Sequence, residues 1–126
     1  MDEKTYARGL EIRKAVVGAD YVERSLANAD DFTRPLQELV TQYCWGEVWS
    51  RDGIDRRARS ILNIGMLIAL NRPQELKLHV KGALTNGLTS DEIRELVLQA
   101  AIYCGVPAAL DASRVAREAI REHQDD

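Results

Sequence analysis

The sequence has few of the residues that mark whole classes of protein. Its 126 residues include two cysteines, two histidines, three prolines and one phenylalanine, and its net charge is only −3. No basic cluster is long enough to favour nucleic-acid binding. The longest apolar run, residues 61–70, contains Asn63 and is too short to span a bilayer. The chain is charged from Asp2 onward, unlike a signal peptide, so we expect a cytoplasmic protein.

The two cysteines, Cys44 and Cys104, lie far apart in the sequence. They form no Cys-x-x-Cys motif and have no histidine at metal-ligand spacing, so no metal site is predicted. Each falls near an apolar helical stripe. We therefore expect both to be buried free thiols that serve packing.

Apolar residues recur with a helical period in nearly every segment, and no segment alternates as a strand would. This pattern predicts a single all-α domain, residues 1–126, with about seven helices. Glycine and proline fall at the junctions, and the last five residues are expected to fray. The expected helices cover residues 2–17, 21–27, 34–49, 56–70 and 73–87, followed by two that begin at the capping sequence Thr89-Ser-Asp-Glu92 and at Pro107.

One histidine is directed toward an interior. In the helix expected over residues 73–87, His79 flanks the apolar stripe, whereas His123 lies in a polar tail. An imidazole at this place is either a buried histidine satisfied by a neighbour or a group used in chemistry near neutral pH. The stripe consists of Leu76, Val80, Ala83 and Leu84.

A carboxylate interrupts the apolar stripe of the helix expected over residues 34–49. Continuing the period of Leu36, Leu39, Val40 and Tyr43 leads to Glu47. A buried carboxylate must pair with an arginine or keep its proton, and the second case would make it an acid or base. Trp45 and Trp49 are expected on the opposite face, where they indicate a second buried surface and hence a subunit interface.

Arginines gather at the start of the helix expected over residues 56–70. They are Arg51, Arg56, Arg57 and Arg59. Guanidinium groups beside a helix N-terminus can bind carboxylates bidentately, and Arg57 points the same way as the buried isoleucines. The alternative, which we favour for Arg56 and Arg59, is pairing with the chain's own acids at the surface.

The strings WGEVWSRDGIDRRARSIL and LKLHVKGALTNGLTSDEIRELVLQAAIYCGVPAA, with an Arg-x-x-Val-x-Gly pattern that begins at Arg13, resemble the carboxymuconolactone decarboxylase family. The resemblance covers essentially the whole chain, with its core over residues 33–118. It implies an alkylhydroperoxidase D-like helical bundle that assembles as homotrimers or homohexamers. It also implies a lyase without a cofactor. The implied reaction converts 4-carboxymuconolactone to the enol-lactone of 3-oxoadipate and CO2, in the protocatechuate branch of the β-ketoadipate pathway.

Three alternatives remain open. The family has a redox branch with a Cys-x-x-Cys-x-x-x-His motif; here His79 holds the histidine place, but Arg72 and Glu75 hold the cysteine places. Peroxidase chemistry needs two adjacent thiols, so this branch is disfavoured. The chain could instead be a non-catalytic assembly module, or a related decarboxylase that acts on another lactone or a β-keto acid.

The reaction implied by the resemblance sets several tasks for the protein. The acetate carboxylate of the substrate needs a cation, for which Arg51 with Arg57 is the prediction. The lactone oxygen needs a hydrogen-bond donor, His79, and the ring carbon needs a proton from His79 or from a protonated Glu47. The leaving carboxylate should lie in an apolar region, for which the candidates are Trp45, Trp49 and Tyr103.

Overall fold

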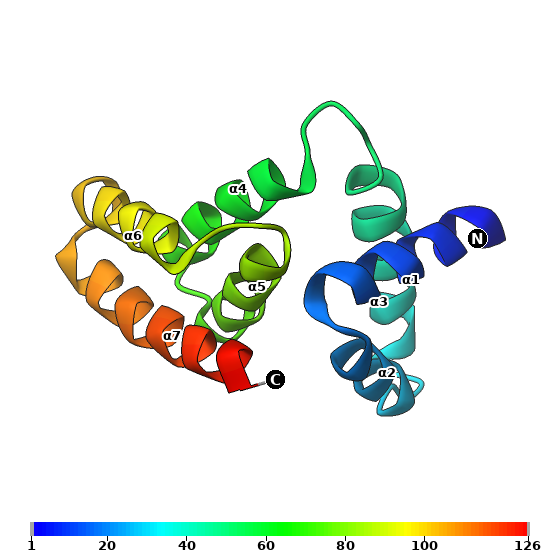
Figure 1. Cartoon of the computed structure of the whole chain (residues 1–126). Coiled ribbons are helices and arrows are strands. Elements are labelled where there is room, and N and C mark those ends of the chain that lie inside the picture. The colour runs from blue at the N-terminus through cyan, green and yellow to red at the C-terminus, as the bar shows by residue number, and fades with distance from the viewer. Residues whose placement is uncertain (1, 126) are drawn as a thin grey trace. The chain divides into compact units, whose positions relative to one another are not determined.

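The computed structural model describes residues 2–125 and, over that range, contains helices and no strand, which confirms the predicted all-α class. The chain forms two compact units that meet in sequence between Ile54 and Asp55. The first unit contains α1 (Glu3–Val17), α2 (Ala19–Ala27), α3 (Arg34–Leu39) and the π-helix η1 (Val40–Val48). The second contains α4 (Arg56–Ala69), α5 (Pro73–Thr85), α6 (Ser90–Cys104) and α7 (Val106–Asp125) (Figure 1).

Most helix boundaries follow from capping side chains. Asp55 accepts a hydrogen bond from the backbone of α4, and Thr89 with Glu92 forms the predicted capping box of α6. Several boundaries differ from the prediction by one or two residues, as at the end of α5 (Thr85), and two of these differences concern the start of α2 and the end of α7. The second helix begins two residues early, directly after Gly18 with φ 98°, and α7 continues through Asp125 where fraying was expected. Neither difference changes which helices exist.

In the first unit, α1 packs closely against η1. The contact is made at glycines: a Cβ atom on Gly9 would lie 2.7 Å from the backbone nitrogen of Gly46, well inside contact distance. Beside this crossing, the buried guanidinium of Arg13 donates to Thr41 Oγ1 at 3.0 Å and to Gln37 Oε1 at 2.9 Å. Arg13 is therefore a structural residue that ties α1 to the segment α3–η1.

The π-helix overturns the prediction of which face of residues 34–49 is buried. Trp45 and Trp49 are 4% and 6% exposed, whereas Glu47 is exposed. The bond from Trp49 N–H to the Cys44 carbonyl spans five residues, so the turn is wider than in an α-helix and the period assumed for the stripe does not hold. The side chains expected in the core but found largely exposed are Leu36, Leu39 and Tyr43.

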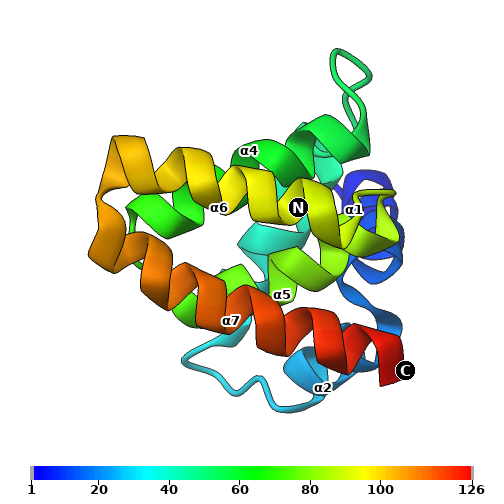
Figure 2. The same cartoon turned by 60° about the vertical axis from the view of Figure 1, so that its left-hand side comes forward.

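In the second unit, α4 packs on α5 and α6, and α7 packs on α5 and α6. Figure 2 shows α6 and α7 running side by side, joined at Gly105, whose φ of 100° favours glycine. The buried face of α7 consists of small side chains, which allow this close packing. Its buried members are Ala109, Ala112, Ala116 and Ala119.

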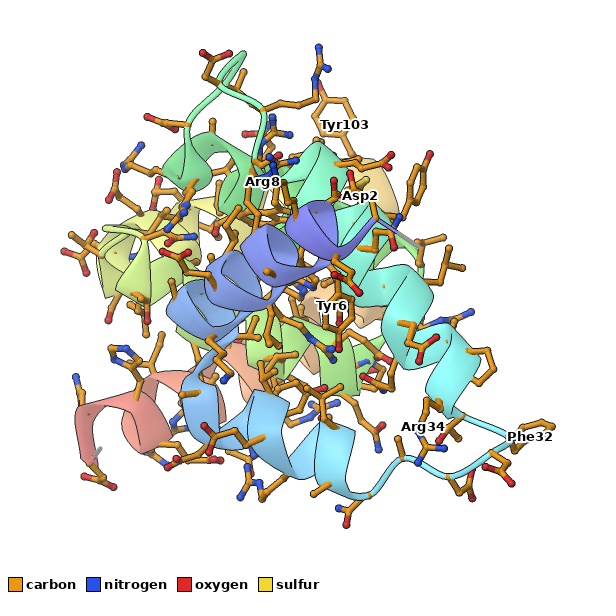
Figure 3. All side chains as sticks on the ribbon, turned by 90° about the vertical axis from the view of Figure 1, so that its right-hand side faces the viewer. Asp2, Tyr6, Arg8, Phe32, Arg34 and Tyr103 are labelled. Carbon is orange, nitrogen blue, oxygen red and sulfur yellow. The ribbon has the colours of Figure 1, made fainter. Side chains whose placement is uncertain are left out.

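Several large apolar side chains remain exposed. Phe32 lies in the loop between α2 and α3 and points away from the ribbon (Figure 3). Ile102 and Tyr103, at the end of α6, are 81% and 83% exposed. Cys104 beside them is also exposed, so its predicted burial is wrong, and Cys44 is only partly buried. Within residues 2–125, none of the helices is both long and apolar enough to cross a membrane.

Candidate functional site

A polar contact in the second unit joins His79 on α5 to Asn63 on α4. His79 is partly buried, between the fully packed positions Leu76 and Val80 of the same helix. The amide nitrogen of Asn63 lies 3.4 Å from His79 Nδ1. In the tautomer of His79 that has its hydrogen on Nε2, the amide nitrogen donates this bond and Nδ1 accepts it. The prediction that His79 faces inward is confirmed.

The surroundings of His79 favour the neutral imidazole. Burial lowers the pKa of His79 below its ordinary value of 6.5, and the carboxylate of Glu75, one turn earlier on α5, opposes this shift. Burial has the larger effect. His79 is therefore neutral near pH 7, when it has one nitrogen that donates a hydrogen bond and one that accepts.

This lowered pKa predicts how the stability of the second unit depends on pH. Because the unfolded chain takes up a proton at His79 near pH 6.5 while the folded chain resists it, folding should be weakened as the pH falls below 6.5. His79→Gln removes this pH-dependent contribution to the unfolding free energy. As the pH falls from about 7.5 to 5.5, we expect the unfolding free energy of the wild type to decrease relative to that of the variant. A constant difference, measured by denaturant unfolding, would contradict the assignment.

A second polar link joins the same two helices. The amide of Asn86 donates to Oγ of Ser60 at 2.9 Å, and Ser60 is fully buried. Asn63 and Ser60 thus each tie α4 to α5, about one helical turn apart. Arg59 lies one turn before Asn63 on the same face of α4, and its Nε atom is shielded from solvent. Arg59 and Asn63 therefore share one face of α4.

The two arginines predicted to bind substrate occupy other places. Arg57 forms an ion pair with Glu92 at the start of α6, and its position on α4 is about a third of a turn away from that of Asn63. This pairing lowers the pKa of Glu92, although the backbone hydrogen bond to Thr89 contributes more. Arg51 belongs to the first unit, where it is exposed in the loop after η1.

In the first unit, Trp45 and Trp49 stack on one another, with ring centroids 4.6 Å apart and planes inclined at 29°. Because both are buried, the expectation that they form an outward subunit interface is wrong. Glu47 lines an open groove together with Glu38 and Tyr43. The burial on which the predicted acid role of Glu47 depended is therefore absent.

Tyr103, the remaining predicted residue, lies at a groove of about 450 Å³ along α4 and α6, in the second unit. Its lining is almost entirely apolar, as a site for a leaving carboxylate would require. His79 is not among the residues that line it. They are Ile61, Leu62, Gly65, Met66, Ala69, Leu96, Gln99, Ala100, Tyr103 and Cys104.

Sequence reasoning missed Asn63 and Arg59 as partners of the site. Asn63 had one visible signal, because it is the one polar side chain inside the apolar run of residues 61–70. A polar residue there must find a hydrogen bond, and His79 is the only imidazole near a core stripe. Within residues 2–125, no three histidine, cysteine, aspartate or glutamate side chains gather as metal ligands.

Comparison with known proteins places the chain among decarboxylases. The model of the carboxymuconolactone decarboxylase family matches residues 34–118. Nitrosuccinic acid decarboxylase of Metarhizium robertsii is 46% identical over 99% of this chain and 87% of its own length. The 4-carboxymuconolactone decarboxylase of Acinetobacter baylyi is 42% identical over 96% of this chain and 90% of its own length. With two relatives matched over nearly its full length, the chain belongs to the carboxymuconolactone decarboxylase family.

Proposed function

We propose that the chain is a carboxy-lyase that converts 4-carboxymuconolactone to the enol-lactone of 3-oxoadipate and CO2. The observation that carries the proposal is a neutral, partly buried histidine beside Asn63, in a chain that matches decarboxylases over nearly its whole length. A second candidate substrate is nitrosuccinic acid, because the relative bearing that name is 46% identical to this chain. The pathway of the first reaction would be protocatechuate degradation.

The two candidate substrates have the same reacting group. Each is a succinate in which one carbon carries a carboxylate, a CH2–carboxylate arm and an electron acceptor. In the lactone, the electron pair of the broken C–C bond moves through the ring double bond onto the carbonyl oxygen. In nitrosuccinate it moves onto the nitro oxygens. The substrate therefore supplies its own electron sink, and a proton completes the reaction on carbon.

The tasks left to the protein are to stabilise an oxygen that gains negative charge and to deliver a proton. A neutral imidazole with one N–H group suits the first task, because it can donate without first losing or gaining a proton. If the same N–H group delivers the proton to carbon, the resulting imidazolate takes up a proton from water before the next turnover. We assign both tasks to His79. Glu47 is the alternative proton donor, and Trp45, Trp49 and Tyr103 remain candidates for the apolar surroundings of the departing CO2.

The carboxylate arm needs a cation, and the geometry of α4 favours Arg59. Arg59 shares the helix face of Asn63, whereas Arg57 lies about a third of a turn away from that face, where it binds Glu92. Arg59→Gln should raise KM at least about tenfold, because charge-assisted hydrogen bonds contribute roughly 1.5–3 kcal/mol. Arg57→Gln and Arg51→Gln are the matched controls and should change KM little. A large increase of KM in either control, with none in Arg59→Gln, would indicate that Arg51 or Arg57 binds the carboxylate arm, as the sequence predicted.

The reaction itself is tested by direct assay. Purified protein is mixed with freshly generated 4-carboxymuconolactone, and in parallel with nitrosuccinate, without added metal or cofactor. CO2 release is followed together with the organic product. We expect turnover of the lactone, and a kcat/KM larger for nitrosuccinate would make the second candidate the substrate. No turnover of either compound by the folded protein would refute the proposal.

The peroxidase alternative has little support from the cysteines. Burial raises the pKa of the Cys44 thiol, an effect that Arg13 only partly offsets, so Cys44 is poor in the thiolate form that attacks peroxides. Cys104 is exposed but lies at the end of α6 in the other unit. A peroxide-reduction assay with a dithiol reductant should show no turnover above that of the Cys104→Ser variant.

Self-association is a further part of the proposal, as a homotrimer or homohexamer. Its support is the exposed apolar surface at the α6–α7 turn, where Ile102, Tyr103 and Val106 are each more than half exposed. Monomeric proteins rarely leave such a patch open to water. Light scattering coupled to size-exclusion chromatography should give a mass of three or six chains, and a monomeric mass at working concentration would refute this part.

A further inference from the structure

We propose that Asn63 is the positioning residue that holds His79 as its Nε2–H tautomer, so that Nε2 is the donor to the substrate oxygen that gains charge. The inference rests on the proposed function for the identity of that oxygen, and on the structure alone for the tautomer. Asn63 itself needs no contact with substrate.

The direction of the hydrogen bond between Asn63 and His79 determines which ring nitrogen of His79 has the hydrogen. The amide nitrogen of Asn63 lies 3.4 Å from Nδ1 of His79. Since that nitrogen donates, Nδ1 carries the lone pair and the single hydrogen of the neutral ring lies on Nε2. The bond thereby selects one of two tautomers that differ in which ring nitrogen can donate.

Both side chains are also held in place. Asn63 is followed on α4 by Ile64, which is fully buried, and His79 is followed on α5 by Val80, also fully buried. The helices are additionally tied by the bond between Asn86 and Ser60. The backbone on both sides of the Asn63–His79 bond is therefore fixed by packing.

The Asn63 amide also suits a neutral imidazole. Burial lowers the pKa of His79, and the opposing effect of Glu75, one turn earlier on α5, is smaller. A neutral donor partner such as an amide leaves the imidazole neutral, whereas a carboxylate at the same place would require the hydrogen on Nδ1. Asparagine at position 63 is thus chemically suited to keep Nε2 as the donor.

The test relies on the fact that the chain has only two histidines. In a His123→Gln background, His79 is the one imidazole left, and its two ring nitrogens can be read by 15N NMR without substrate. Above the titration midpoint we expect hydrogen on Nε2. Asn63→Asp should move the hydrogen to Nδ1, raise the midpoint, and lower kcat about tenfold or more with KM little changed. Asn63→Leu should leave a mixture of tautomers.

Asn86→Asp is the matched control. It places the same new carboxylate at the same pair of helices, but its partner is Ser60, so the His79 spectrum should stay that of the parent. The proposal is overturned if hydrogen lies on Nδ1 in the parent protein, or if Asn63→Asp leaves it on Nε2. If the NMR result is as expected but neither candidate substrate turns over, the tautomer assignment holds and the proposed function fails.

Discussion

Replacing His79 with alanine should lower kcat for decarboxylation by about a hundredfold or more, while KM changes little. The reason is that the donor to the charged oxygen acts mainly in the transition state, where general acids and oxyanion donors typically contribute at least that factor. The measurement is steady-state release of CO2 from the substrate that the direct assay identifies.

Two companion variants sharpen the result. His123→Gln replaces the other histidine, whose Nε2 lies 3.5 Å from Thr85 Oγ1, and should retain parental turnover. Glu47→Gln reports on the competing proton donor. If His79→Ala is folded and fully active while Glu47→Gln is inactive, the proton comes from Glu47. If both retain parental turnover, the acid–base scheme is wrong.

Gly9→Ala should destabilise the first unit by about 3 kcal/mol, because overpacking at a rigid contact forces the backbone apart. The new Cβ would lie 2.7 Å from the Gly46 nitrogen and also press on the Thr41 carbonyl, and neither backbone group can rotate away. Both tryptophans belong to the unit that contains Gly9, so denaturant unfolding followed by tryptophan fluorescence reports on it directly.

Gly65→Ala is the contrasting substitution. Gly65 is also helical, but a Cβ there meets nothing within 4 Å, so the change should raise stability by up to about 1 kcal/mol through helix propensity. The two variants make the same chemical change with opposite expected signs. Equal small effects would mean that α1 and η1 are not in close contact in solution.

Much of the fold could be predicted because its signals are local. The capping box at Thr89, the aspartate before α4 and the proline at the start of α5 each act within one turn of the helix they begin. The buried face of residues 34–49 could not be predicted in this way. Both faces of that segment carry apolar residues, and the choice between them is made by η1 winding and by α1, which packs through two glycines.

The candidate site was predictable only where a residue type is scarce. His79 stood out because the chain has two histidines and one of them borders a core stripe. Its partner Asn63 is sixteen residues away on another helix, and no local pattern relates the two. The arginines show the same limit: four of them are close in sequence, but the rotation of α4 and the position of Glu92 decide which side each one faces.

The winding of η1 also bears on how this segment tolerates insertions and deletions. The backbone hydrogen bonds of η1 span five residues. Removal of one residue would allow the four-residue hydrogen bonds of an α-helix. Such a deletion would wind the segment at about 100° per residue, as in an α-helix, and so change the direction in which its side chains project. Trp49 would leave its stacking partner, and Arg51 would enter its loop from another side. Among related sequences, insertions and deletions should therefore be rarer in η1 than in the exposed loop that contains Phe32.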